Sequence, residues 1–256
     1  MAESPVLIER RGASLLVTIN RPDQRNAVNR ATADALEQAF HEFEADKKAR
    51  VMVLTGAGGR AFCAGADLNA PGGLIERDNE GGSPLGFTRL TPSKPTIAAV
   101  RGYAVAGGLE LALWCDLRIA ADDATFGCFE RRWGVPLIDG GTQRLPRVVG
   151  QGRALDLVLT GRPVDATEAL AIGLATEVVA AGTEVDRALE LAERIAAFPW
   201  PTVLSDRRAL IEGSGLPLDR GLEIERDAGR EVLLTAAAGA KRFAGGAGRR
   251  GSFDAV

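Results

Sequence analysis

Two short segments rich in glycine and alanine constrain this chain more than any other feature. They are AFCAGADL at residues 61–68 and GYAVAGGLELA at residues 102–112, and each places a small-residue turn beside an acidic residue. Turns lined by Gly and Ala let a ligand come close enough to meet backbone N–H groups. Two such turns predict an oxyanion hole, a pair of N–H donors that stabilises negative charge developing on an oxygen atom.

The turns carry different predicted features. In the second segment a predicted strand at 96–100 leads through glycines into a predicted helix, so the Gly107 amide would face an anion and Glu110 would lie in the first helical turn. In the first segment we expect the Ala66 amide to point into a cavity and Asp67 to cap a short helix. Tight strand–helix packing without a ligand is the alternative for these glycines.

A third segment, FGCFERRWGVPLIDGGTQRLP at residues 126–146, adds Glu130 and Asp139. If Glu110 and Glu130 face one water molecule, one carboxyl can remove its proton while the other delivers a proton to carbon, and the two would titrate together. This combination indicates acyl-thioester chemistry. The alternatives are a helix-start or surface role for either glutamate, and for Asp139 a capping role at the following GGTQRL helix.

Histidine is scarce, which leaves acid–base chemistry to carboxylates. The sequence contains one histidine, His41, which falls between the core positions of a predicted helix at 29–46. We expect it near solvent. The chain therefore lacks a candidate base for a Ser-His-Asp or Cys-His nucleophile.

The sequence also contains a glycine pattern typical of dinucleotide binding, but the residues that follow it do not favour that function. Residues 56–61 (GAGGRA) follow a predicted strand at 51–55 and fit G-x-G-x-x-G/A. That fingerprint requires a helix to begin among the glycines. The chain instead runs through FCAGA and soon reaches Pro71-Gly72-Gly73, so no long helix fits and a nicotinamide cofactor is not favoured.

Composition excludes several classes of partner. The 256 residues are 46% hydrophobic, enough for one sizeable core, and the net charge of −3 offers no basic field for nucleic acid. No apolar run approaches the roughly 20 residues that span a bilayer, and MAESPVLIERR lacks a signal core, so we expect no membrane association and a cytoplasmic location. Cys63, Cys115 and Cys128 form no paired or C-x-x-C pattern, which predicts buried thiols and no metal site.

Strand and helix patterns alternate along most of the chain. The predicted strands are residues 15–19, 51–55, 96–100, 117–120 and 176–179, with helix-length patterns between them. This order predicts an α/β fold with buried strands. Residues 70–94 are rich in Gly, Pro and charge and read as too polar for the core, hence as a lid over a substrate or a surface excursion.

The last part of the chain is predicted to be helical. Asp165 and Glu168 are spaced as a capping box, and a further helix pattern covers 183–197. Two prolines in Phe198-Pro199-Trp200-Pro201 then mark a boundary between a core at 1–198 and a helical region at 199–256. This region has too few residues for its own core, so it packs on the main body or on a neighbouring subunit. Its cationic stretch at 241–253 either meets phosphates or is a solvated terminus.

These motifs resemble the crotonase, or enoyl-CoA hydratase/isomerase, superfamily. The likeness covers nearly the whole chain: RPDQRNAVN (21–29), AFCAGADL, GYAVAGGLELA, GGTQRLPRVVG (140–150) and GRPVDATEALAIGLATEVV (161–179). It implies a spiral of ββα units with a helical C-terminal trimerisation region. It also implies that Ala66 and Gly107 supply the oxyanion-hole amides and that Glu110 and Glu130 are the paired catalytic carboxylates.

The resemblance further implies an enoyl-CoA hydratase of fatty acid metabolism, which adds water to a trans-2-enoyl-CoA. Coenzyme A is then part of the substrate and no separate cofactor is needed. The protein would be a homotrimer or homohexamer. The expected substrate-binding residues are Arg25, Ala64, Asp67, Leu68 and Asp139, with Phe243 and Arg249 reaching CoA across an interface.

Two departures keep other reactions open. Cys128-Phe129 precede Glu130 where hydratases often carry a proline, and Asp139 stands where familiar hydratases have a small residue and some isomerases an acid. Isomerisation of an enoyl- or dienoyl-CoA by Glu130 or Asp139 is therefore the first alternative. A non-catalytic scaffold that binds acyl-CoA or a partner protein is the second.

Overall fold

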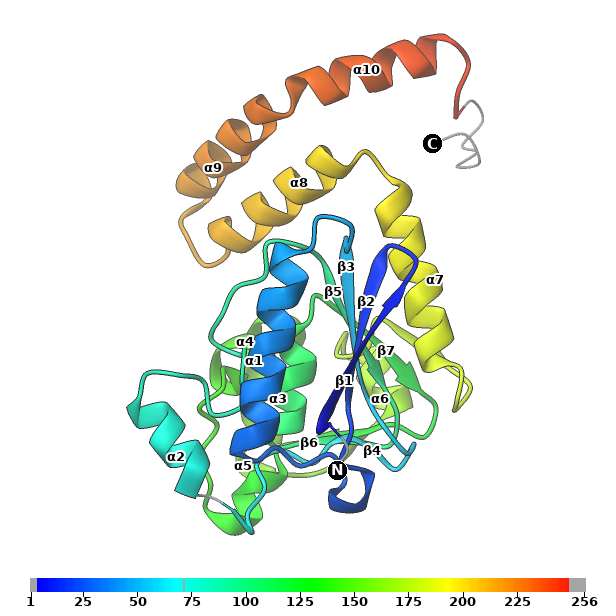
Figure 1. The fold of residues 1–256 in the computed structure, drawn as a ribbon. Helices are drawn as coiled ribbons and strands as arrows, with labels where there is room; N and C mark the ends of the chain where they lie inside the picture. Colours follow the sequence, from blue (N-terminus) through cyan, green and yellow to red (C-terminus); the bar gives the residue numbers. More distant parts are fainter. Residues whose placement is uncertain (1–3, 71, 249–256) are drawn as a thin grey trace.

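The structure is a computed structural model that describes residues 4–70 and 72–248, and a six-stranded sheet forms its centre (Figure 1). The sheet order is β1-β2-β3-β5-β7-β10. β1 and β2 form an antiparallel hairpin, and the remaining neighbours are parallel. The strands are β1 (Val6–Arg11), β2 (Ser14–Ile19), β3 (Val51–Gly56), β5 (Thr96–Val100), β7 (Leu117–Ala121) and β10 (Glu177–Val179).

A second, smaller sheet creates the repeat of the fold. It has the order β4-β6-β8-β9, with strands β4 (Ala61–Cys63), β6 (Tyr103–Val105), β8 (Thr125–Gly127) and β9 (Val164–Asp165). β4, β6 and β8 each follow the preceding strand of the large sheet after a short turn, and a helix comes next. Three successive strand–strand–helix units therefore run through both sheets, which confirms the predicted α/β fold of ββα units.

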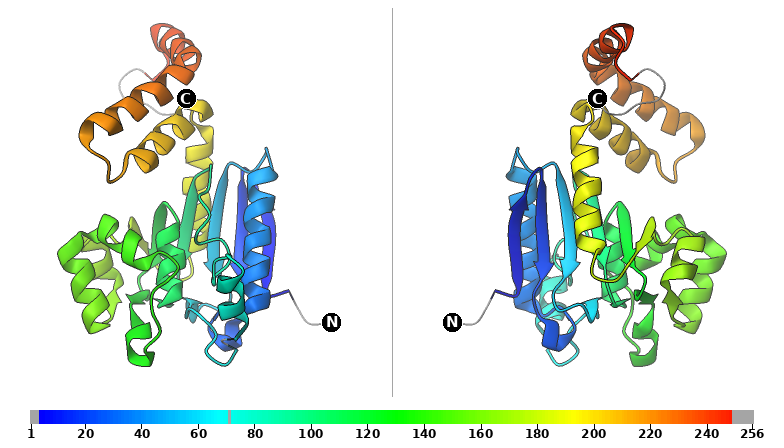
Figure 2. Two further views of the ribbon diagram at one scale, coloured as in Figure 1. Left: turned by 90° about the vertical axis from the view of Figure 1, so that its left-hand side faces the viewer. Right: turned by 90° about the vertical axis from the view of Figure 1, so that its right-hand side faces the viewer.

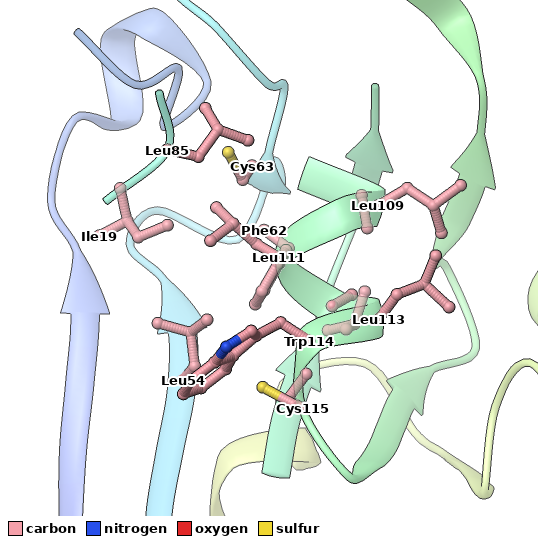
Figure 3. Packing of buried hydrophobic residues seen from close by; sticks show 14 of the residues in the cluster. Ile19, Leu54, Phe62, Cys63, Leu85, Leu109, Leu111, Leu113, Trp114 and Cys115 are labelled. Atoms are coloured by element: carbon pink, nitrogen blue, oxygen red, sulfur yellow. The ribbon is translucent and has the colours of Figure 1, made fainter. Parts of the chain in front are cut away.

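Helices cover both faces of the large sheet. α1 (Arg30–Ala45) and α3 (Gly107–Trp114) pack on one face, and α7 (Glu184–Ala197) packs on the other (Figures 1 and 2). Figure 3 shows Ile19 and Leu54 of the sheet facing Leu111 and Trp114 of α3 in the main core. All residues of α3 are buried, which makes it a rigid central helix.

Three further helices come between β8 and β10 along the chain. They are α4 (Gly141–Val149), α5 (Gln151–Thr160) and α6 (Ala166–Ala171). Asp165 caps α6 as predicted, because its side chain accepts a hydrogen bond from Glu168 N at 2.8 Å. The Glu168 carboxylate pairs with Arg162 instead of completing the box.

The C-terminal helices form an arm that rises from the body (Figure 2). α7 ends at Ala197, and the prolines start a new direction in α8 (Trp200–Gly213), followed by α9 (Leu218–Glu231) and α10 (Leu233–Ala244). An ion pair at 2.8 Å between Arg207 and Asp116 attaches α8 to the body. Among the described residues, no helix has the length and apolar character required to cross a bilayer.

The expectation for residues 70–94 is partly wrong. The charged part forms α2 (Gly72–Asn79), but residues 83–88 are buried and bring Leu85 and Phe87 into the core. Arg77 explains this arrangement, since its buried guanidinium pairs with Asp34 and Glu37 of α1. Paired charge lets a polar segment pack against the core.

Two smaller expectations also need correction. No helix follows Asp67 directly; its carboxylate accepts a hydrogen bond from Asn69 N at 3.1 Å and pairs with Arg21 at 2.9 Å. The short strands β1, β4, β6, β8 and β9 were not predicted, because three residues or fewer, or an exposed polar strand, give no clear periodicity. The glycines at 56–61 lead into β4, so the dinucleotide fingerprint has no helix here.

Candidate active site

A cavity of about 510 Å³ opens beside the N-terminus of α3. Its walls come from α2, the two glycine turns, the 3-10 helix η2 (Phe129–Trp133) and the loop before α4. The apolar walls are Leu74, Ile75, Pro84, Leu85, Val105, Phe129, Trp133, Val135, Pro136, Leu137 and Ile138. Four acids, Asp78, Glu110, Glu130 and Asp139, are exceptions to this apolar surface.

The two glycine turns meet at one wall of the cavity. The first turn is fixed to Val28, which donates to Gly65 O and accepts from Asp67 N, both at 2.8 Å. A Cβ added to Gly65 would lie 2.8 Å from Gly107 N, so the turns are in direct contact. Within the described residues neither Ala66 N–H nor Gly107 N–H donates a hydrogen bond. Both therefore remain available to a ligand.

Close packing and unusual backbone conformations fix the shape of this wall of the cavity. Gly65 has φ +90°, a conformation that disfavours a side chain. Ala106, which precedes α3, has φ +53° and ψ −127°, also unusual for a residue with a Cβ. Its N–H donates to Gly127 O at 2.9 Å, which ties the strained turn to β8. The strain places Gly107 N as the first free amide of the helix.

Glu110 is a buried residue of the cavity lining, and it anchors the start of α4. Its Oε1 accepts hydrogen bonds from Asp139 N at 3.0 Å and from Gly141 N at 2.7 Å. Burial, together with the charges of Asp139 and Glu130, raises the pKa of Glu110 to about 7, although the two backbone donors oppose the rise. Glu110 can therefore exchange a proton near neutral pH.

Glu130 lies opposite in η2 and is left without hydrogen-bond donors. It is 3% exposed, and neither carboxyl oxygen has a hydrogen-bond partner within the described residues. Arg131 Nε is 3.6 Å from Oε1, inside ion-pair range but beyond hydrogen-bond distance. Burial raises the pKa of Glu130, with Arg131 opposing the rise. An unpartnered buried carboxyl at a cavity is a strong candidate for a functional group.

Asp139 does not cap α4, which corrects the structural alternative for this residue. Its Oδ1 accepts hydrogen bonds from Leu85 N at 3.2 Å and from the Thr88 hydroxyl, while Glu110 caps the helix in its place. Burial raises the pKa of Asp139, and the bonds from Thr88 and Leu85 oppose this.

Comparison with known proteins accords with this geometry. The enoyl-CoA hydratase/isomerase family matches residues 9–243. The chain belongs to this family. A probable enoyl-CoA hydratase from Rhizobium meliloti is 40% identical over 92% of each chain, and a short-chain-enoyl-CoA hydratase from Clostridium acetobutylicum is 38% identical over 90% of each. The crystal structure of enoyl-CoA hydratase EchA1 from Mycobacterium marinum superimposes with a TM-score of 0.87 at 41% identity, covering 94% of this chain and 96% of that one.

In this member of the enoyl-CoA hydratase/isomerase family, the predicted substrate residues are only partly brought together. Ala64 and Leu68 line the cavity, and the exposed Arg25 lies beside them because its carbonyl accepts from Ala64 N at 3.1 Å. Asp67 is not a lining residue. Phe243 is exposed on α10, at the opposite end of the molecule from α2 (Figure 1), and Arg249 lies outside the described residues. Roles for these residues in CoA binding remain predictions.

Several residues of the site could not be predicted from sequence motifs. Leu85 contacts the glycine wall, since a Cβ on Gly107 would lie 2.4 Å from Leu85 Cδ1. Thr88 and Arg144 bond to Asp139, and Trp133 forms part of the cavity wall. Most of these contacts join distant parts of the chain and belong to no motif. In the described part of the chain, no group of three or more His, Cys, Asp or Glu side chains is arranged to hold a metal ion.

Proposed function

We propose that this protein is an enoyl-CoA hydratase that adds water across the double bond of a trans-2-enoyl-CoA. The carrying observation is that Glu110 and Glu130 are buried at one cavity, beside the free amides of Ala66 and Gly107. Relatives at 38–40% identity that bear hydratase names support the same reaction.

The two amides act as the oxyanion hole. The thioester carbonyl oxygen accepts hydrogen bonds from Ala66 N and Gly107 N, which draws electrons from the double bond and makes the β-carbon electrophilic. Loss of one such donor typically raises the barrier by about 3–4 kcal/mol. Support for this assignment comes from the direct contact of the two turns and the absence of competing acceptors among described residues.

The different surroundings of the two glutamates assign their roles. Two backbone donors favour the ionised form of Glu110, so it takes a proton from water as the water oxygen bonds to the β-carbon. Glu130 has no such donors, which favours its protonated form, and it delivers its proton to the α-carbon. The electron pair of the double bond passes through the enolate and forms the new C–H bond. Glu110 is left protonated and Glu130 ionised, so Glu110 releases its proton to water and Glu130 takes one up from water before the next turnover.

The cavity favours an apolar acyl group. Apart from Asp78, Glu130 and Gly134, the lining residues of α2, η2 and residues 134–138 are aliphatic or aromatic, which suits a hydrocarbon tail. The exposed Arg25 beside Ala64 and Leu68 suits a CoA phosphate at the rim. Asp67, which pairs with Arg21, supports this rim indirectly.

The assembled enzyme is a homotrimer or homohexamer built through the C-terminal arm. Apolar side chains are exposed along α9 and α10, including Leu222, Leu233, Leu234 and Phe243. Exposed apolar surface of this extent is typical of an interface. In such an assembly Phe243 and Arg249 of one copy would approach CoA bound to another.

The deciding experiment follows crotonyl-CoA with purified protein. We expect loss of the enoyl-thioester absorbance and a product heavier by one water. Glu110→Gln and Glu130→Gln should each lower kcat by about 10²–10⁴-fold. Glu184→Gln is the matched control, because Glu184 is also buried, at 6% exposure, but lies in α7.

Other outcomes identify the alternatives. A product of unchanged mass with a shifted double bond would indicate isomerisation by Glu130 or Asp139. Binding of acyl-CoA without turnover across several chain lengths would indicate the scaffold. A cytoplasmic location and a role in fatty acid metabolism stay predictions.

A further inference from the structure

The Asp139 carboxylate links two segments that are far apart in the sequence. Asp139 is 3% exposed, and its Oδ1 accepts from Leu85 N and from the Thr88 hydroxyl, both in the buried segment after α2. Its Oδ2 receives no hydrogen bond from the described residues. The side chain therefore acts on residues 85–88 through one oxygen atom.

The backbone of Asp139 makes the connection to the catalytic helix. Its N–H donates to Glu110 Oε1 at 3.0 Å, next to the bond from Gly141. Its carbonyl accepts from Arg144 Nη1 at 2.9 Å, and Arg144 Nη2 donates to Thr88 O at 2.6 Å. Asp139 and Thr88 are thus joined twice, once through side chains and once through Arg144.

The segment held by Asp139 also supports the glycine wall. Leu85 Cδ1 lies 2.4 Å from the position of a Cβ on Gly107, so the Leu85 side chain packs directly on the residue that supplies one free amide. Figure 3 shows Leu85 beside Cys63, at the end of the strand that leads into the other turn. A displacement of Leu85 would therefore change the packing around Gly107 and the position of its amide.

We propose that Asp139 is a positioning residue. It fixes the Glu110 carboxylate and the Gly107 amide relative to each other, and it carries no proton in the reaction. The inference rests on the proposed hydratase function and deepens it. Bonds from Leu85 and Thr88 fix the carboxylate, and its own backbone N–H fixes Glu110. This role differs from the alternative in which Asp139 shuttles protons for an isomerase.

Charges around Glu110 make the role measurable. Asp139 precedes α4, Glu130 lies in η2, and Arg144 extends from α4; these are the charged groups that act on Glu110, with the thiol of Cys128 nearby. The negative charge of Asp139 raises the pKa of Glu110. Around Asp139 itself the charged neighbours are Arg89, Asp78, Arg144 and Glu110.

Three variants test the proposal. Asp139→Asn keeps an acceptor oxygen at Oδ1 but removes the charge, Asp139→Ala removes both, and Thr88→Val removes one donor but leaves the charge. We expect D139N to retain kcat within about tenfold and to move the acid limb of kcat/KM to lower pH. D139A should lose about 10- to 100-fold through misplacement of the reacting groups. T88V should lose less than about tenfold, with its acid limb at the wild-type pH.

The opposite results would overturn the proposal. A loss above about 100-fold in D139N beside near-normal T88V would make Asp139 a proton carrier. Equal activity of D139A and D139N would show that the hydrogen bonds position nothing. If D139A does not fold, D139N and T88V decide between these outcomes.

A second readout separates this proposal from the proposed function. Hydrogen exchange of residues 85–88, 107–114 and 139–149 needs no substrate, and we expect faster exchange in all three segments of D139A than of D139N. Unchanged exchange would refute the positioning role even in an active enzyme. Failure of the wild type to hydrate any enoyl-CoA would refute the proposed function, while the exchange result would still stand on its own.

Discussion

Glu110 and Glu130 differ in what surrounds them, and this difference sets the pH dependence of the reaction. In the proposed reaction Glu110 must be ionised to take a proton from water, and because its pKa is raised to about 7, kcat/KM should fall below that pH by about tenfold per unit. A pH–rate profile with crotonyl-CoA from about pH 5.5 to 9 measures this limb. Full activity persisting well below the limb would contradict the role of Glu110 as the base.

The raised pKa of Glu110 also links protonation to stability. An acid whose pKa is higher in the folded state stabilises the fold below its unfolded value of 4.5, and this contribution disappears as pH rises through about 7. The full shift corresponds to about 3 kcal/mol. Glu110→Gln should therefore gain stability relative to wild type as pH increases, as measured by denaturant unfolding at several pH values. A constant difference would show that burial does not raise this pKa.

At the scale of elements, the junction between β4 and α3 tolerates no added atom. A Cβ on Gly108 would lie 1.9 Å from Cys63 O, a backbone atom next to the first turn. Gly108→Ala should destabilise the protein by about 1–3 kcal/mol or more and abolish turnover. Gly152→Ala is the matched control in α5, where a Cβ meets nothing within 4 Å, and should stabilise by up to about 1 kcal/mol. Thermal unfolding compares the two, and equal Tm values would refute the close contact.

The attachment of α2 to α1 controls one wall of the cavity. Arg77 is 5% exposed, pairs with Asp34 and Glu37, and donates to Ser83 O at 2.6 Å. Arg77→Met should cost about 2 kcal/mol and raise KM more than it lowers kcat, because α2 carries Leu74 and Ile75 of the cavity.

Arg30→Met is the matched control for this change. Arg30 shares Asp34 with Arg77, but its side chain is 38% exposed and that of Arg77 only 6%, so loss of Arg30 should change Tm and KM less. Steady-state kinetics and thermal unfolding test both variants. A KM of R77M equal to that of R30M would mean that the buried pairs do not hold the cavity wall.

Sequence patterns predicted the elements with strong local signals. The buried strands around Val53 and Ala98 and the helix around Leu36 match the structure closely, because apolar periodicity and capping residues are local properties. The strands β4, β6 and β8 were missed because each is three residues long and is defined by its partners across the small sheet.

The same distinction applies to the site. Glu110, Glu130 and the two amides stand in recognisable motifs, and the cavity unites them. The bonds from Leu85 and Thr88 to Asp139 span more than fifty positions, so no local pattern could indicate them. The position of Asp139 before two glycines is typical of a helix cap, but its side chain instead accepts hydrogen bonds from Leu85 and Thr88.

At the scale of the whole molecule, the C-terminal arm offers a test of assembly. Leu234 is 89% exposed on α10, and Leu222 is 52% exposed on α9. In a homotrimer or homohexamer these side chains would be buried between copies, so Leu222→Glu together with Leu234→Glu should release the 26.9 kDa monomer. Light scattering with size-exclusion chromatography measures the mass.

A matched substitution controls for surface charge. Leu159→Glu alters a leucine that is 74% exposed on α5, away from the arm, and should leave the oligomer intact. A monomeric wild type would rule out the proposed assembly, and loss of the oligomer in L159E would place the interface elsewhere.

Because Glu110 caps α4, the backbone amide that it binds should respond to each change in the ionisation of Glu110. Gly140 offers no side-chain cap, so the first amide of α4, that of Gly141, donates to the Glu110 carboxylate, which changes charge in the proposed reaction. The resonance of the Gly141 amide proton should therefore follow the ionisation of Glu110 directly. NMR of the protein with an isotope label at Gly141 would therefore follow the protonation of Glu110 without a probe on the substrate.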